Sequence, residues 1–155
     1  MTQTELEQER KWMMIATQDI LCAGKATFTL TGMDRRWTFR IVKIENEDGR
    51  EPIFFATLLT GSDNDDNYTY LGVYQPAVGW VKLTKASQYK EDSEVVRALR
   101  WVVGLIYNNN ESEIDSKGFR LVWSSTCQRC GRTLTVPSSV DNRLGPECAK
   151  KVDGE

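Results

Sequence analysis

Residues 26–45 read Ala-Thr-Phe-Thr-Leu-Thr-Gly-Met-Asp-Arg-Arg-Trp-Thr-Phe-Arg-Ile-Val-Lys-Ile-Glu. Apolar and polar side chains alternate over residues 26–31 and again over residues 37–45, which is the pattern of strands that bury one face. A Gly-Met-Asp segment separates the two runs and is typical of a turn. The stretch therefore predicts an antiparallel hairpin, in which Phe39 and Ile41 share one face of the second strand.

Further strands are expected downstream of this hairpin. The sequence Asn46-Glu-Asp-Gly49 is a hairpin turn signal, and short polar or glycine-containing segments separate the runs that follow. The strands are therefore predicted to form an antiparallel meander of about five strands. The later strands of this meander are expected at residues 53–60, 68–74 and 80–84. One more strand, at residues 119–123, is expected to lead into the C-terminal part of the chain.

Two helices are predicted to pack with this sheet, which gives an α+β fold class. The first spans residues 4–21, where Thr4 and Glu7 have the spacing of a capping box. The second begins after Asp92 or Ser93, and its apolar residues recur with the helical period. That apolar stripe consists of Val95, Val96, Leu99, Val102, Val103 and Ile106. Residues 111–117 are expected to form a linker.

Three cysteines near the end of the chain have the spacing of metal ligands. Cys127 and Cys130 are separated by two residues and followed by Gly131, and such a knuckle directs both thiolates toward one tetrahedral metal ion. Seventeen residues separate Cys130 from Cys148, which is enough for a loop that returns a third sulfur to the metal. The pattern predicts a small treble-clef or ribbon-like zinc finger with Zn²⁺ as its cofactor.

The fourth ligand of this zinc finger is not obvious. A structural zinc ion normally has four protein ligands, and the chain contains no histidine. Cys22 is a candidate, although a free cysteine is commonly a small buried apolar side chain. Glu147 or Asp141 could supply an oxygen instead, as could a water molecule or a second chain. The sequence leaves these alternatives open.

Two other chemistries fit the sequence less well than zinc. A disulfide between Cys127 and Cys130 would resemble a thioredoxin-type redox motif, but no strand-CxxC-helix pattern surrounds the pair. Residues 63–67 alternate acidic and amide side chains as a calcium-binding loop does. However, Tyr68 stands where such a loop has glycine, and Tyr74 stands where it has glutamate. Residues 63–67 are therefore expected to be a solvated connection.

Charge is divided unevenly along the chain, whose formal net charge is -2. Residues 117–151 contain seven basic and two acidic residues, a net charge of +5, whereas residues 1–116 carry a net charge of -5. A basic zinc module is suited to contacts with nucleic-acid phosphates. The residues expected to make these contacts are Arg129, Arg132, Arg143, Lys150 and Lys151.

The tyrosines and tryptophans of the predicted sheet could also stack on the bases of single-stranded nucleic acid. Aromatic residues of a meander more often pack in or beside a core. The acidic balance of residues 1–116 also disfavours a polyanionic ligand. The sequence therefore favours packing over stacking for these rings.

The residues around the cysteines carry a resemblance to a known family. The motif Cys-x-x-Cys-Gly-Arg-x-Leu-Thr-x-Pro, followed by Gly-Pro-x-Cys-Ala, resembles the C-terminal module of an uncharacterised family carried by bacteriophages and other mobile elements. The resemblance continues in residues 23–30, 59–64 and 68–72 and in the helix around Trp101, so it covers most of the chain. It implies a phage-type protein in the cytoplasm of a bacterial host, and no particular activity. Members often carry a histidine shortly before the first cysteine, where this chain has residues 122–126. The absence of that histidine makes Cys22 a candidate for a compensating ligand.

Composition limits the class of protein further. The chain has 155 residues, of which 40% are apolar, and five tryptophans, which is enough for one compact domain with a small appended module. The body is expected at residues 1–116 and the zinc-finger module at residues 117–155. The sequence shows no apolar run that predicts a signal peptide or a membrane span. Cysteines in a metal-type spacing fit a reducing cytoplasm.

Catalysis has little support in the sequence. The chain has no histidine, no glycine-rich phosphate loop after a strand, and no deaminase-type glutamate motif beside the cysteines. The sequence therefore predicts a non-enzymatic protein that binds nucleic acid through its basic module. The alternative is a protein that binds a host protein through its acidic body, with a purely structural zinc finger. The oligomeric state is left open.

Overall fold

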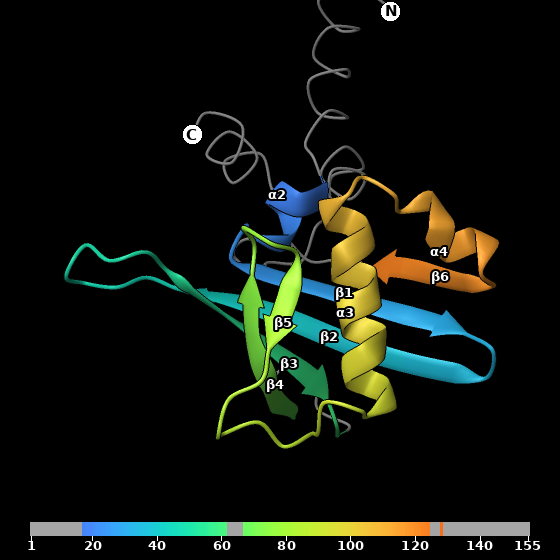
Figure 1. Cartoon of the computed structure of the whole chain (residues 1–155), viewed down its shortest axis with the longest axis horizontal. Helices are drawn as coiled ribbons and strands as arrows, with labels where there is room; N and C mark the ends of the chain where they lie inside the picture. The colour runs from blue at the N-terminus through green and yellow to red at the C-terminus, as the bar shows by residue number, and fades with distance from the viewer. Residues whose placement is uncertain (1–16, 62–66, 125–127, 129–155) are drawn as a thin grey trace, which may run out of the picture.

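The computed structural model describes residues 17–61, 67–124 and 128 of the chain (Figure 1). In chain order the described elements are α2 (Thr17–Leu21), β1 (Lys25–Gly32), β2 (Arg35–Ile44), β3 (Ile53–Leu59), β4 (Tyr68–Gln75), β5 (Trp80–Lys82), α3 (Glu94–Tyr107), α4 (Ser112–Ser116) and β6 (Phe119–Trp123). None of the helices described here is long and apolar enough to cross a membrane. Of the first predicted helix, residues 4–16 lie outside the described part.

The six strands form one antiparallel sheet in the order β5-β4-β3-β2-β1-β6. β1 to β5 follow one another as a meander, and the chain then passes through α3 and α4 before β6 pairs with β1. In this last pairing Phe28 lies opposite Trp123, and Gly32 lies opposite Phe119. The prediction of an antiparallel sheet combined with helices is confirmed, and the sheet has six strands. The three C-terminal cysteines of the predicted zinc finger lie outside the described residues.

One face of the sheet forms the core of the protein. Alternation along the strands places Phe28 and Leu30 of β1 on this face together with Phe39 of β2, and all three are fully buried. α3 lies across the same face (Figure 1), and its apolar stripe from Val95 to Ile106 is buried as predicted. Each such side chain contributes about 1.5–3 kcal/mol when it leaves water. The alternation of the strands and the stripe of α3 therefore determine how these elements pack.

Residues 111–117 are not the linker that the sequence predicted. Residues Ser112–Ser116 form α4, and Ile114 is 2% exposed as part of the core. One apolar side chain in an otherwise polar segment is enough to anchor this short helix beside β6. The residues of β6, which were assigned to the C-terminal module, form an edge strand of the sheet. The division of the chain at residues 116 and 117 stays a prediction.

The turn between β1 and β2 has an unusual backbone. Gly32 pairs with Arg35, so Met33 and Asp34 form a two-residue connection, and their φ angles are 49° and 61°. Positive φ at both positions is the geometry of a type I′ turn, which favours Asn-Gly and costs a residue such as methionine about 1–2 kcal/mol. The side chain of Met33 is 73% exposed, so it contributes little packing in return.

Replacing Met33 with asparagine and Asp34 with glycine should therefore stabilise the protein. The double variant is expected to raise the free energy of unfolding by about 1 kcal/mol, because Asn-Gly adopts the required positive φ angles with less strain. Urea unfolding of the variant and the wild type measures the difference. An unchanged or lower free energy of unfolding would show that this turn is not strained.

Candidate functional site

Gln128 is a fully buried polar residue that joins the C-terminal part of the chain to the start of β1. Its side-chain Oε1 accepts a hydrogen bond from the Thr27 N–H at 2.5 Å, and its backbone carbonyl accepts one from the Lys25 N–H at 2.7 Å. Its Nε2 donates to the Ser124 carbonyl at 3.1 Å. Gln128 therefore accepts hydrogen bonds from two backbone N–H groups of β1, those of Lys25 and Thr27.

The side-chain amide of Gln128 continues the pairing of β6 with β1 beyond the end of the strand. The Ser124 N–H donates to the Thr27 carbonyl at 3.1 Å, and the Thr27 N–H is bonded to Gln128. Both backbone groups of Thr27 are thus satisfied by residues that follow β6. A buried N–H without a partner costs about 1–3 kcal/mol, so the hydrogen bond to Gln128 stabilises the folded state.

Cys22 is the predicted zinc ligand that the structure describes. It lies in the turn between α2 and β1, three residues before Lys25, and its side chain is half-buried. Burial, and then the carboxylate of Asp19, raises the pKa of the Cys22 thiol to about 11, with a smaller opposing effect from Lys43. Without a metal the thiol is therefore protonated at neutral pH, and it would have to lose this proton to bind Zn²⁺.

The structure places Cys22 and Gln128 at the same end of β1. In the sequence Gln128 stands between Cys127 and Cys130, so a residue of the predicted zinc knuckle is held close to the fourth candidate ligand. The predicted ligands outside the described residues are Cys127, Cys130 and Cys148. The predicted phosphate contacts Arg129, Arg132, Arg143, Lys150 and Lys151 are also outside. Within residues 17–61, 67–124 and 128, no group of three or more histidine, cysteine, aspartate or glutamate side chains could hold a metal ion.

A buried tyrosine fixes α2 to the sheet near Cys22. Tyr74 of β4 is 1% exposed, and its hydroxyl donates to Gln18 Oε1 at 2.7 Å. Gln18 Nε2 in turn donates to the Pro76 carbonyl at 3.1 Å. Burial is the main cause that raises the pKa of Tyr74 well above its usual range, and the neighbouring Cys22 adds to the shift.

The stability of the protein is therefore expected to fall above pH 10. A tyrosine in the unfolded chain ionises near pH 10, whereas folded Tyr74 keeps its proton. The folded state then binds more protons than the unfolded state, and Tyr74 lowers the free energy of unfolding by up to about 1.4 kcal/mol per pH unit. Tyr74→Phe should cost about 1 kcal/mol at pH 8 through the lost hydrogen bond, and this deficit should shrink at pH 11. Urea unfolding at both pH values tests it, and equal losses in both proteins would contradict it.

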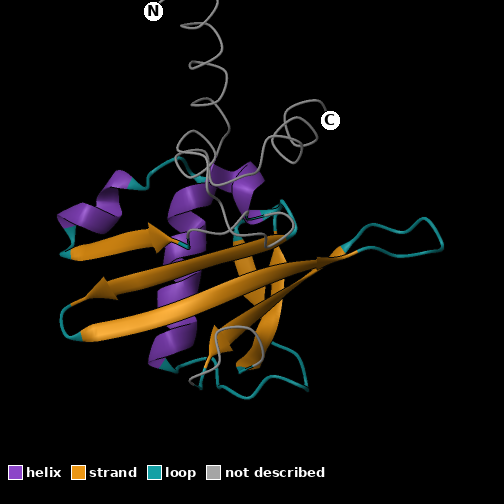
Figure 2. Ribbon diagram, turned by 180° about the vertical axis from the view of Figure 1, so that it is seen from behind, coloured by secondary structure: helices purple, strands orange, loops and turns teal. Residues whose placement is uncertain are grey.

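The second face of the sheet points away from α3. Figure 2 shows this face toward the viewer, with α3 behind the strands. Near its centre, Arg40 Nε donates to Thr27 Oγ1 at 3.0 Å, and the Arg40 guanidinium lies 4.2 Å from the centre of the Tyr68 ring. The rings of Phe55 and Tyr70 meet edge-on with their centroids 5.9 Å apart. Thr27 is buried and the other four residues are half-buried. We call this face of the sheet, formed by the residues that alternate with the core positions of the strands, the outer face.

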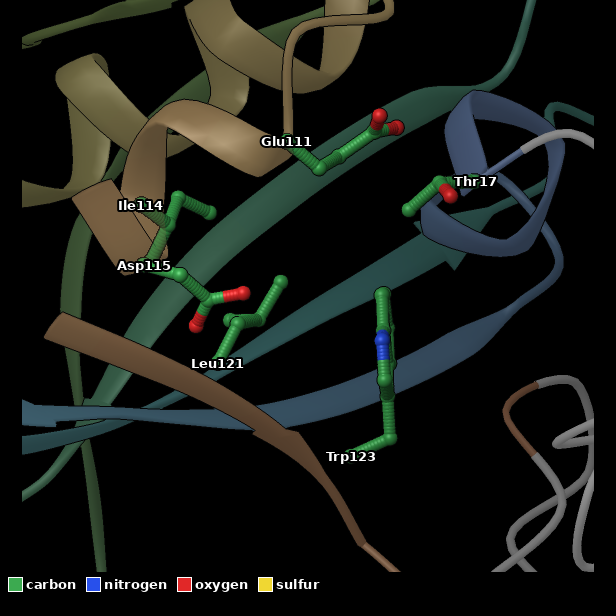
Figure 3. Close-up of a pocket in the computed structure, with 6 residues that line it drawn as sticks. All are labelled: Thr17, Glu111, Ile114, Asp115, Leu121 and Trp123. Atoms are coloured by element: carbon green, nitrogen blue, oxygen red, sulfur yellow. The ribbon is translucent and has the colours of Figure 1, made fainter.

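A pocket of about 240 Å³ lies where α2, α4 and β6 meet (Figure 3). Its lining residues are Thr17, Glu111, Ile114, Asp115, Leu121 and Trp123. In Figure 3, Glu111 and Asp115 come from the α4 side, and Thr17 from α2 on the opposite side. Two carboxylates and an indole ring suit a cationic group such as a lysine or arginine side chain and repel phosphate.

Sequence reasoning missed two of these features. No sequence signal marks Gln128 as buried, because a glutamine between two cysteines of a zinc knuckle is expected to be exposed. The outer face did have a signal, since strand alternation separates residues such as Arg40 from the core positions. The charge of residues 1–116 was instead summed over the whole segment, which hid the difference between the two faces.

The described elements define an α+β protein built on a single antiparallel sheet. Residues 122–153 are similar to a family of unknown function (DUF6011). This match begins within β6, includes Gln128 and covers all three C-terminal cysteines, and it agrees with the resemblance to an uncharacterised family. Neither a curated protein nor a solved structure matches the chain significantly.

Proposed function

We propose that the chain is a non-enzymatic accessory protein of a bacteriophage or another mobile element, which acts in the cytoplasm of the bacterial host. In this proposal it binds nucleic acid through a basic C-terminal module that is organised by a structural zinc ion. The observation that carries the zinc part is the buried anchoring of Gln128 at the start of β1. Because consecutive Cα atoms are about 3.8 Å apart, this anchor limits how far Cys127 can lie from β1.

The same anchor supports Cys22 as the fourth zinc ligand. Cys127, Cys130 and Cys148 supply three thiolates in the predicted site, and a closed structural site needs one more ligand. Cys22 lies three residues before Lys25, whose N–H is bonded to Gln128. A zinc ion held by all four cysteines would cross-link the C-terminal module to the start of the sheet and would add its binding free energy to folding.

Metal analysis of the purified full chain tests this site. About one zinc ion per chain is expected, because the four cysteines would form a single closed site. Cys22→Ser should lose its zinc to a mild chelator that leaves the wild type loaded, whereas Thr29→Ser, a similarly small change in β1, should behave as wild type. A Cys22→Ser variant that retains zinc as the wild type does would place the fourth ligand elsewhere.

The nucleic-acid part of the proposal is supported by the net charge of +5 on residues 117–151. Fluorescence anisotropy of a short labelled DNA with the full chain tests it at low salt. Affinity should fall steeply with salt because neutralised phosphates release counterions. Arg129→Glu with Arg132→Glu should abolish module-dependent binding without loss of zinc. Lys90→Glu with Arg97→Glu, which changes the charge equally at exposed positions near and within α3, is the matched control.

The acidic pocket favours a second candidate function, which is docking on a host protein. A lysine or arginine side chain of the partner would fit between Glu111 and Asp115 and lie against Trp123. In this alternative the zinc module is purely structural. Capture of the partner from nuclease-treated host lysate should then be lost in Glu111→Gln with Asp115→Asn. It should survive in Asp92→Asn, which neutralises an exposed carboxylate before α3.

A further inference from the structure

Charge is segregated between the sheet and the rest of the described chain. The six strands contain seven basic residues and no aspartate or glutamate. Two of the seven, Arg35 and Lys43, form ion pairs with Glu94 and Glu45 respectively. The other five occupy positions that alternate with the core residues of their strands and so belong to the outer face. These five are Lys25, Arg36, Arg40, Lys82 and Arg120.

The acidic residues that give the chain its low pI lie elsewhere. Among the described residues they occur in loops, as Glu47, Asp48 and Glu51 do in the β2–β3 hairpin, or on the helices and the segments that precede them. The isoelectric point of about 5.3 therefore describes the whole chain and not this surface. All charged side chains of the strands on the outer face are basic. This surface is therefore positive, as the binding of a polyanion requires.

The basic residues are arranged across several strands and not along one of them. Thr31 of β1 pairs with Arg36 on β2 and with Arg120 on β6, so these two arginines flank one position from both sides. Both are exposed, as are Lys25 and Lys82. No described helix crosses the face between them, because α3 lies behind the sheet in this view (Figure 2). The cations thus span the face from its β6 edge to β5.

Aromatic rings lie between these cations. Tyr70 of β4 lies opposite Thr57 and Tyr68 opposite Leu59, and both rings are half-buried, as is Phe55 beside Tyr70. Their positions on β3 and β4 place them between Arg40 on β2 and Lys82 on β5. Half-exposed rings with neighbouring cations can stack on unpaired bases while the cations contact phosphates. The bases of a duplex are already stacked on one another and are not accessible to rings in this way.

We propose that the outer face of the sheet binds single-stranded nucleic acid. Lys25, Arg36, Lys82 and Arg120 contact phosphates, and Phe55, Tyr68 and Tyr70 stack on bases. This inference takes its ligand class from the proposed function and rests on it to that extent, but it uses none of the five basic residues that were predicted to contact phosphates in the zinc module. An acidic protein would match the charge equally well, but it would leave the rings between the cations without a function.

The test compares three charge-reversal variants of the full chain. They are a sheet variant (Arg36→Glu with Arg120→Glu), a module variant (Arg129→Glu with Arg132→Glu) and a control variant (Lys90→Glu with Arg97→Glu). Each changes the net charge equally, so a general repulsion would affect all three. Anisotropy titrations use a labelled 20-nucleotide single strand of mixed sequence and the same sequence as a duplex, at several salt concentrations. Circular dichroism confirms folding, and Arg36→Gln with Arg120→Gln replaces the sheet variant if it does not fold.

We expect the sheet variant to lose at least tenfold in affinity for the single strand, while the control stays within twofold of wild type. Its slope of log affinity against log salt should fall by about 1.4, which corresponds to two lost phosphate contacts on a single strand. Tyr70→Ala should lower the affinity about tenfold with an unchanged salt slope, because it removes a stacking ring and no charge. The wild type should prefer the single strand to the duplex.

Other results overturn the inference in distinguishable ways. If only the module variant loses affinity, the proposed function stands and the outer face is not the binding surface. If the wild type binds neither DNA, both proposals fail. Equal binding of duplex and single strand would show that the face is a general polyanion surface. Equal losses in the sheet and control variants would show that the overall charge of the chain, and not the outer face, determines the affinity. Tighter binding of polyglutamate than of the single strand would identify an acidic protein as the ligand.

Discussion

Gln128→Ala is expected to lower the free energy of unfolding by about 2–4 kcal/mol, because it leaves the buried N–H of Thr27 without its acceptor and opens a small cavity. The effect should reach the sheet and the C-terminal segment together. Thr27 is itself 5% exposed, so water has little access to replace the lost acceptor. Urea unfolding of the full chain, followed by circular dichroism, measures the change.

Two further variants separate the causes of this loss. Gln128→Met keeps most of the side-chain volume and removes the acceptor, so it should retain at least half of the destabilisation if the hydrogen bond dominates. Gln88→Ala removes an exposed glutamine side chain whose Nε2 donates to the Ala86 carbonyl at 3.4 Å, and it should change stability by less than about 0.5 kcal/mol. A Gln128→Ala protein as stable as Gln88→Ala would show that Gln128 does not anchor β1.

The hairpin and the long helix could be predicted from the sequence because their signals are local. Alternation over β1 and β2 depends on neighbouring residues, and so does the stripe of α3 from Val95 to Ile106. The predicted strand positions differ from the observed ones only at their ends, as in β5, where the strand stops at Lys82 and the prediction continued to residue 84. Such signals fix which residues face the core.

The pairing of β6 with β1 could not be predicted in the same way. Phe28 and Trp123 are distant in the sequence, and nothing in either local pattern specifies the partner of an edge strand. The same holds for Gln128, whose burial depends on a hydrogen bond to a residue 101 positions earlier. The linker prediction failed for a related reason, since Ile114 is buried by elements from other parts of the chain. Cys22 as a zinc ligand, and the ligands outside the described residues, stay predictions.

The outer face shows how a summed charge can mislead. The net charge of -5 on residues 1–116 disfavoured a nucleic-acid ligand, yet none of the six described strands contains an aspartate or glutamate. The alternation of residues along the strand identifies the outer face, because Arg36 and Arg40 alternate with the buried residues of β2. A sequence that is acidic overall can therefore present a basic sheet, provided that its carboxylates lie in loops and helices.

A substitution in the core between the sheet and α3 has the largest expected effect. Phe28→Ala should lower the free energy of unfolding by about 3–5 kcal/mol, because Phe28 is fully buried and its removal leaves a cavity. Its ring lies 5.7 Å from the centroid of Phe39 on β2 and 5.3 Å from that of Trp123 on β6. The variant therefore weakens the contacts of three adjacent strands at once.

Phe55→Ala is the matched control, since it removes the same side chain from the outer face of β3, where Phe55 is half-buried. Phe55→Ala should lower the free energy of unfolding by only about 1–2 kcal/mol, because folding buries less apolar surface at that position. If β6 folds with the rest of the sheet, the Phe28→Ala protein should unfold in one transition with a wild-type dependence on urea. Two separate transitions would instead mean that residues from 117 onward fold as an independent module, so this experiment also tests the predicted division of the chain.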